Sequence, residues 1–205
     1  MWKISLILLL LCEIVPIQAQ SSDELYKKLD STYGKLSTFQ AEVKQTNQFA
    51  QIKQTITYTG KIWFSGGRMV ISFDKPSFQR LQIGNSQVEL YDRASNTLFR
   101  TAMLPEFGKM NPVDILRHYW TKSKVQVLKT EKGLATVKLI PNKDPMISSM
   151  TAVMNIKTGL VNSLSYEDSA SNKVTYAFSG IRLDQPIKAD VWSYSYPKGT
   201  QVLEQ

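Results

Sequence analysis

Cysteine and histidine are nearly absent from this chain of 205 residues, which contains one of each, Cys12 and His118. A structural His/Cys metal site needs four ligands and a disulfide needs two cysteines, so the sequence excludes both. Long apolar runs are scarce too. The run near the N-terminus, Ile4–Leu11, is shorter than the ~20 residues with which a helix crosses a bilayer. We therefore expect no membrane-spanning helix in the mature chain.

The chain also has few of the groups that an enzyme needs. His118 is the one imidazole base, and no Gly-x-Ser-x-Gly motif supplies a nucleophile. Gly66 and Gly67 lack the following Lys-Ser/Thr of a phosphate-binding loop. The neighbouring acids Glu167 and Asp168 fall in a predicted turn, where acids are normally solvated. We predict no catalytic residue, no cofactor and no metal.

Basic residues outnumber acidic ones, with 25 Lys and Arg against 17 Asp and Glu and a net charge of +8. This excess favours an anionic partner but does not say which kind. The basic residues are scattered along the chain instead of clustered, which argues against a nucleic-acid-binding protein.

The first 19 residues have the layout of a secretory signal peptide: the basic Lys3, the apolar run Ile4–Leu11, and a small residue, Ala19, at the expected cleavage site. We predict export, with residues 20–205 as a single domain. An alternative is a lipoprotein acylated at Cys12. It is disfavoured because Leu11 stands where lipoprotein processing needs a small residue.

Most of the mature chain has the composition of β-strands, with Val, Ile, Thr and aromatic residues in short segments separated by Gly, Asn, Asp, Ser or Pro. The connections are too short for parallel crossovers, so we predict one antiparallel meander in a mainly β (α+β) fold. The predicted strands are Thr38–Gln48, Gln54–Phe64, Arg68–Asp74, Phe78–Ile83, Gln87–Tyr91, Thr97–Ala102, Lys124–Lys129, Ala135–Ile140, Met150–Ile156, Leu160–Glu167, Lys173–Ser179 and Val191–Tyr196.

Two helices are expected beside these strands. Ser21 and Glu24 form a capping box before an amphipathic helix, Ser22–Leu36. Asn111 and Pro112 are a good N-cap and first residue for a second helix, Asn111–Trp120. The loop before it, Met103–Met110, carries apolar side chains that either fold onto the core or cover an apolar site.

Apolar and aromatic residues alternate along the predicted strands and so share one face of the sheet. On a curved sheet, such a face either packs as an ordinary core or leaves a hollow for an apolar ligand. The candidate lining residues are Ile56, Tyr58, Ile62, Phe64, Met69, Ile71, Phe73, Val88, Leu90, Met154, Ile156, Tyr176 and Phe178.

Six features follow one another along the chain. They are FQAEVKQ at residues 39–45, GKIWF at residues 60–64, a strand ending in Lys75-Pro76, the strand at residues 87–92, the helix that opens with Asn111-Pro112, and WSYSYPKG at residues 192–199. In their order they resemble the motifs of the outer-membrane lipoprotein carrier protein family, LolA. FQAEVKQ is similar to the family's F-x-A-x-F-x-Q strand, and WSYSYPKG is similar to its closing F-x-F-x-P-P-x-G.

The resemblance implies an incomplete antiparallel β-barrel of about 11 strands, closed by lid helices, which holds the acyl chains of lipoproteins in its hollow. It also implies a periplasmic monomer that takes its cargo from an inner-membrane lipoprotein-releasing ABC transporter, with or without an outer-membrane receptor. The lid residues would be Leu25, Leu29, Ile115, Leu116 and Tyr119.

One position departs from the family pattern. Relatives commonly have Arg-Pro after the strand that ends here at Phe64, and that arginine holds the lid shut, whereas this chain has Gly66-Gly67 and then Arg68. We predict that Arg68 acts as the lid latch, by bonding to the second helix or to the loop Met103–Met110. The alternative function is a related half-barrel that binds free lipid or senses envelope stress.

Overall fold

The structure, a computed structural model, describes residues 21–84, 86–102 and 113–204. Some predicted features lie outside these residues: the signal peptide 1–19, Cys12, the loop Met103–Met110, and Asn111 and Pro112. The elements in chain order are α1 (Ser22–Tyr33), β1 (Thr38–Phe49), β2 (Gln54–Ser65), β3 (Arg68–Lys75), β4 (Gln79–Gly84), β5 (Gln87–Asp92), β6 (Thr97–Ala102), α2 (Asp114–Trp120), β7 (Ser123–Glu131), β8 (Leu134–Pro141), β9 (Ser149–Asn155), β10 (Val161–Glu167), β11 (Lys173–Leu183), the 3₁₀ helix η2 (Ala189–Trp192) and β12 (Gln201–Glu204).

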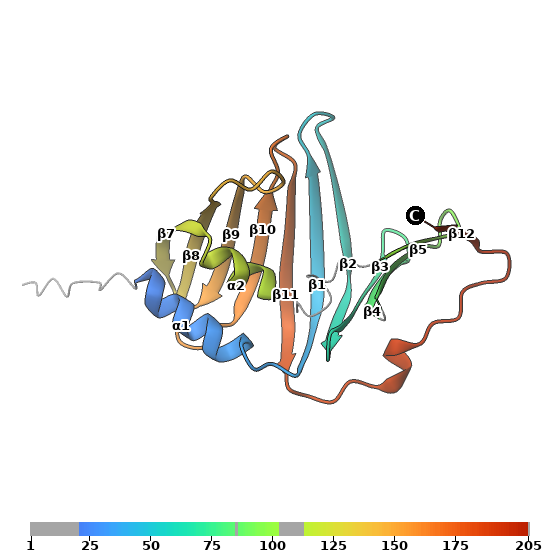
Figure 1. Cartoon of the computed structure of the whole chain (residues 1–205), viewed down its shortest axis with the longest axis horizontal. Helices are drawn as coiled ribbons and strands as arrows, with labels where there is room; N and C mark the ends of the chain where they lie inside the picture. Colours follow the sequence, from blue (N-terminus) through green and yellow to red (C-terminus); the bar gives the residue numbers. More distant parts are fainter. Residues whose placement is uncertain (1–20, 85, 103–112, 205) are drawn as a thin grey trace, which may run out of the picture.

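The twelve strands form one sheet in the order β12-β6-β5-β4-β3-β2-β1-β11-β10-β9-β8-β7. Its edges, β7 and β12, are not paired with each other, so the sheet is curved but open (Figure 1). The predicted mainly β class is confirmed, with twelve strands instead of about 11. The single meander is wrong: β1 to β6 form one meander and β7 to β11 another, and β1 joins them by pairing with β11.

The C-terminal segment differs from the prediction. Val191–Tyr196 is not a strand, although its aromatic residues alternate as in a strand. These side chains pack over the outer face of the sheet: Tyr194 stacks on Phe78 with ring centroids 5.5 Å apart. Arg80 of β4 fastens the segment by donating a hydrogen bond of 2.6 Å to the Val191 carbonyl. The last strand is instead β12, which pairs in parallel with β6.

Local sequence explains α1. The predicted capping box is present, with Ser21 accepting from the Glu24 N–H and Glu24 accepting from the Ser21 N–H. The helix ends at Tyr33, three residues before the predicted Leu36, because Gly34 follows as its C-cap. None of the helices in the described part of the chain is long and apolar enough to cross a membrane.

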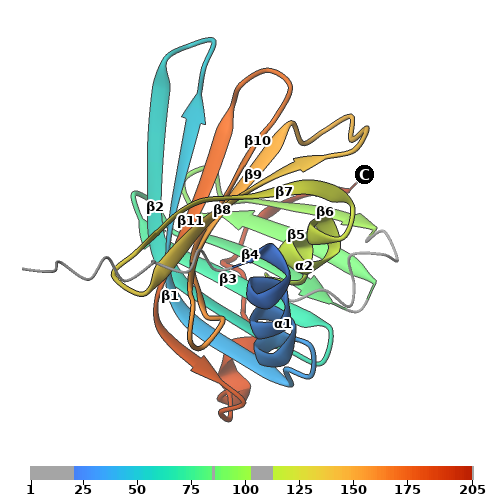
Figure 2. The same cartoon turned by 90° about the vertical axis from the view of Figure 1, so that its left-hand side faces the viewer.

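Both helices lie on the concave side of the sheet, over β7 to β10 (Figures 1 and 2). Their buried side chains join the concave-facing residues of the strands in one core. The C-terminal segment covers the opposite face, outside β3 to β6 (Figure 1). The concave face of β3 to β6 therefore has neither of the described helices over it.

Candidate functional site

A row of apolar residues crosses the concave face from the middle of the sheet to its edge. Neighbouring strands place its members directly opposite one another, and residues opposite each other share a face. We call this set the concave row: Ile62, Ile71, Leu81, Leu90, Phe99 and Leu203. A second row beside it consists of Phe64, Met69, Ile83 and Val88.

Exposure rises along the concave row toward the edge of the sheet. Ile62 is 1% exposed, whereas Leu90, Phe99 and Leu203 are 38%, 43% and 39% exposed. Large apolar side chains are exposed here together and not singly, a pattern that is typical of surfaces that bind apolar partners. The concave row is therefore the candidate site.

The predicted lining residues share the concave face but differ in how deeply they are buried. Ile62, Phe64, Ile71, Phe73, Met154 and Phe178 belong to the buried core, and Tyr58, Met69, Ile156 and Tyr176 pack partly buried against it. Ile56 and Val88 are half-buried, and Leu90 is exposed. The residues around Met154 thus behave as ordinary core beneath the helices, whereas Leu90 is exposed.

The predicted lid residues lie against the core. Leu25, Leu29 and Leu116 are fully buried, and Ile115 and Tyr119 are partly buried. Tyr119 donates a hydrogen bond of 2.7 Å to Asp144 in the loop between β8 and β9. That bond helps to hold the pKa of Asp144 below its usual value, while burial and the same bond raise the pKa of Tyr119 to about 12.

An ion pair that sequence reasoning missed joins the two helices. Arg117 of α2 pairs with Asp30 of α1, its Nε 3.1 Å from Oδ1, and also with Asp114 at 2.7 Å. Tyr26 and Trp120 add a ring contact between the same helices, with centroids 5.8 Å apart. The helices therefore form one connected unit over the core.

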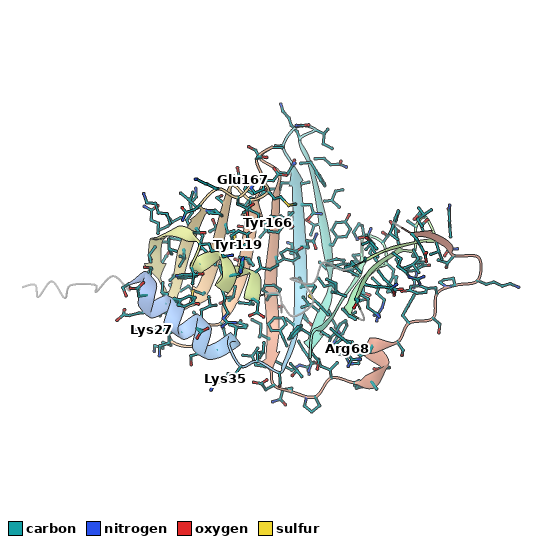
Figure 3. The ribbon with its side chains drawn as sticks, viewed as in Figure 1. Lys27, Lys35, Arg68, Tyr119, Tyr166 and Glu167 are labelled. Atoms are coloured by element: carbon teal, nitrogen blue, oxygen red, sulfur yellow. The ribbon has the colours of Figure 1, made fainter. Side chains whose placement is uncertain are left out.

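Arg68 has a different neighbour from the predicted one. Its guanidinium lies 4.6 Å from the ring centroid of Trp192, in a cation–π contact on the outer face. Figure 3 shows it near η2 and far from α2. The loop Met103–Met110 lies outside the described residues, so the latch contact with that loop stays a prediction.

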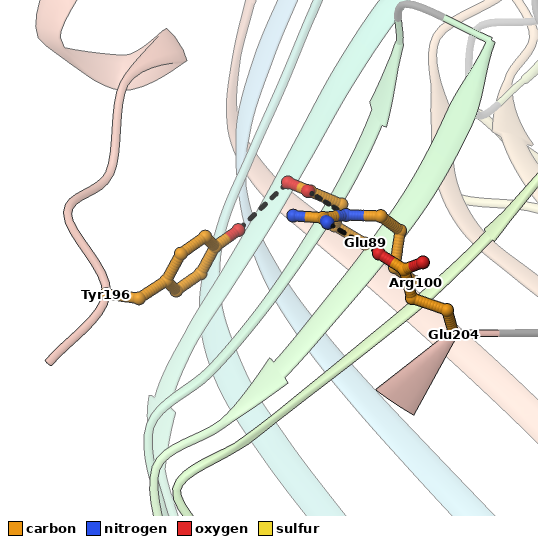
Figure 4. Close-up of polar contacts among 4 residues, drawn as sticks. All are labelled: Glu89, Arg100, Tyr196 and Glu204. Carbon is orange, nitrogen blue, oxygen red and sulfur yellow. Dashed lines mark hydrogen bonds and ion pairs between the residues drawn. The ribbon is translucent and has the colours of Figure 1, made fainter. Parts of the chain in front are cut away.

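A polar network ties the C-terminal segment and β12 to β5 and β6 (Figure 4). Arg100 bonds to Glu89 at 2.9 Å and to Glu204 at 3.0 Å, and the Tyr196 hydroxyl donates to Glu89 at 2.9 Å. Burial, with the Glu89 bond, raises the pKa of Tyr196 to about 12. The network fixes β12 against β6 and so places Leu203 at the end of the concave row.

A depression of about 520 Å³ lies on the outer face, over β1 to β3 and β11, and it is largely charged. Its lining includes Glu42, Lys44, Lys61, Asp74 and Lys75. His118 is exposed, and the described residues contain no group of three or more His, Cys, Asp or Glu side chains that could hold a metal.

Three members of the concave row were not predicted: Leu81, Phe99 and Leu203. Leu81 and Ile83 do alternate within a predicted strand, a signal that was available. Phe99 stands next to Leu98, which is also apolar but is buried on the other face, so the segment shows no apolar alternation. Leu203 belongs to a four-residue strand that gives no periodic signal.

Comparison with known proteins identifies a family. The profile of the family described as "Outer membrane lipoprotein carrier protein LolA" matches residues 34–195. An outer-membrane lipoprotein carrier protein from Cupriavidus taiwanensis is 26% identical over 196 residues, which cover 93% of this chain and 90% of the relative. A protein of the same description from Cupriavidus necator has the same identity and coverage.

A solved structure shows the same fold. It is an uncharacterized conserved protein from Thermus thermophilus, with a TM-score of 0.57 at 12% identity, covering 91% of this chain and all of that one. Because the LolA family profile extends over more than half of the sequence, the chain belongs to the LolA family of outer-membrane lipoprotein carrier proteins.

Proposed function

We propose that this chain carries lipoproteins across the periplasm from the inner to the outer membrane, with their acyl chains on the concave row. The observation that carries the proposal is the run of apolar residues from Ile62 to Leu203, which is exposed toward the edge of the sheet. Family membership supports the kind of cargo.

The energetics suit a carrier that must release its cargo. Each methylene removed from water contributes about 0.8 kcal/mol, so a deep enclosed cavity would hold three acyl chains too tightly for transfer. A row that is open at β12 covers only part of each chain. Acyl chains can then enter and leave sideways without unfolding the sheet.

The cellular setting is part of the proposal. Residues 1–19 would direct export and be cleaved after Ala19, leaving a monomer in the periplasm that receives cargo from an inner-membrane lipoprotein-releasing ABC transporter. The intact mass of the protein from the periplasmic fraction tests this. A form held in the membrane and beginning at acylated Cys12 would contradict it.

Binding of an apolar fluorescent probe, displaced by a triacylated lipopeptide, tests the concave row. Leu90→Ser and Phe99→Ser remove apolar surface from residues that are already partly exposed, so they should weaken lipopeptide binding several-fold with little loss of stability. Leu128→Ser is the matched control, because Leu128 is 50% exposed but lies at the irregularity in the β7–β8 register, away from the row.

Equal affinity of all three variants for the lipopeptide would contradict the concave row as the binding site. A wild-type chain that binds phospholipid or fatty acid but never a lipopeptide would favour the alternative, a half-barrel that binds free lipid.

A further inference from the structure

The concave face changes from apolar to polar toward one end of its longest strands. Gln45 of β1 lies opposite Tyr58 of β2 on one side and Tyr176 of β11 on the other. Two residues further on, Asn47 lies opposite Ile56 and Val174, and Tyr166 of β10 follows Val174 in the same row. We call the five polar members of these rows the polar collar: Gln45, Asn47, Tyr58, Tyr166 and Tyr176.

The polar collar borders the apolar layer directly. The Tyr58 ring lies 5.3 Å from that of Phe73, and the Tyr176 ring stacks on that of Phe178 with centroids 6.4 Å apart and planes 6° from parallel. Tyr166 completes the group, with its ring 6.5 Å from that of Tyr176. A ligand lying on the phenylalanines would therefore place its next atoms among the hydroxyl and amide groups of the polar collar.

The polar collar offers uncharged hydrogen-bond donors. Gln45 donates through its amide to Asn47 at 2.8 Å, which leaves the Asn47 amide N–H groups available. Burial raises the pKa of Tyr166 and of Tyr176, so both hydroxyls keep their protons and can donate. Within the described part of the chain, the Tyr58 hydroxyl makes no hydrogen bond. It is not one of the buried polar atoms without a partner, so a ligand can reach it.

The nearby charges belong to the other face. Lys44 is adjacent to Gln45 and exposed on the outer face, and Glu167 and Lys173 are cross-strand partners one residue from Tyr166 and Val174. Because successive side chains of a strand point to opposite faces, these charges point away from the polar collar. The site suits neutral acceptors better than a carboxylate or a phosphate.

We propose that the polar collar binds the ester and amide carbonyls that join the acyl chains of a lipoprotein to its N-terminal cysteine. These carbonyls are uncharged acceptors that lie directly beside the acyl chains, in the order in which the polar collar follows the apolar layer. The proposal rests on the proposed function and adds to it how the cargo is oriented. The acyl chains run along the phenylalanines toward the concave row, and the polypeptide leaves past Tyr166.

Displacement of a bound apolar fluorophore from the mature chain by two ligands tests this assignment. The ligands are a synthetic tripalmitoylated cysteinyl tetrapeptide, which has the ester and amide carbonyls, and palmitate, which has an acyl chain and a carboxylate. The variant Y58F/Y166F removes two hydroxyls and keeps the rings. We expect its affinity for the lipopeptide to fall roughly tenfold, with palmitate unchanged.

The control is Tyr194→Phe, which removes a hydroxyl from the C-terminal segment on the outer face, keeps the ring that stacks on Phe78, and should leave both affinities unchanged. A thermal melt establishes that each variant is folded. Unchanged lipopeptide affinity in the double variant would overturn the polar collar as a head-group site, as would equal weakening of both ligands. If the wild-type chain binds neither ligand, the proposed function itself fails, an outcome distinct from failure of the polar collar alone.

Discussion

At the scale of single residues, one tyrosine hydroxyl joins α1 to the sheet. Tyr33 is 1% exposed, and its hydroxyl accepts a hydrogen bond of 3.1 Å from the backbone N–H of Val161 in β10. The sequence predicted the amphipathic helix that contains Tyr33, but it could not show this bond, because the partner is distant in the sequence. The same limit hid the pairing of Arg117 with Asp30.

Replacing Tyr33 by Phe should destabilise the fold. The Val161 N–H would stay buried without an acceptor, which costs about 1 to 3 kcal/mol of unfolding free energy. Urea unfolding measures the loss. Tyr26→Phe is the control, because the Tyr26 ring packs on Trp120 while its residue is only half-buried; a loss as large as that of Tyr33→Phe would contradict the role of the hydrogen bond.

Stability should also fall at alkaline pH. Burial raises the pKa of Tyr33 to about 12 from its ordinary value of 10.0, so the folded chain keeps a proton that the unfolded chain releases. The contribution of Tyr33 to stability is therefore complete below pH 10 and is lost as the pH rises toward 12. Tyr33→Phe should show a shallower decline of unfolding free energy over this range. An identical slope in both proteins would count against the raised pKa.

At the scale of elements, sequence patterns identified most strands and both helices because apolar alternation and capping are local signals. The strand predicted at Val191–Tyr196 was wrong. Its aromatic residues do alternate, but an extended chain can pack aromatic side chains on the face of a sheet without pairing as a strand. β12 was missed because Gln201–Glu204 forms a strand only by pairing with β6. The approach of α1 to α2 likewise depends on tertiary contacts.

The link between the helices can be tested through Arg117→Met. Removing the guanidinium breaks its bonds to Asp30 and Asp114, and because the Asp30 carboxylate is half exposed we expect a loss of about 0.5 to 1 kcal/mol. Backbone amides of α1 and α2 should exchange hydrogen faster, with those of β2 unchanged. Lys129→Met is the control, since the ion pair of Lys129 with Glu131 is exposed at both ends. Unaltered exchange in both helices would show that they do not depend on this bridge.

At the scale of the whole molecule, the two halves of the sheet differ in how their concave faces are covered. Strands β7 to β10 have α1 and α2 over them, whereas the concave row, which runs from β2 to β12, grows more exposed toward β12. Composition and alternation predicted an antiparallel sheet with one apolar face, and the family resemblance implied that the sheet is curved. Neither indicated where that face is open, since this depends on strand order and on the outer position of the C-terminal segment.

Photocrosslinking in living cells tests most directly whether lipoprotein acyl chains occupy the concave row. Benzoylphenylalanine at Phe99 preserves an aromatic side chain on the row, and the same residue at Leu128 serves as the exposed control. The account predicts that Phe99 crosslinks to acylated lipoproteins, and that the crosslinks disappear when lipoprotein acylation is blocked, while Leu128 gives none. Crosslinks to lipoproteins from Leu128 but not from Phe99, or crosslinks that persist without acylation, would contradict it.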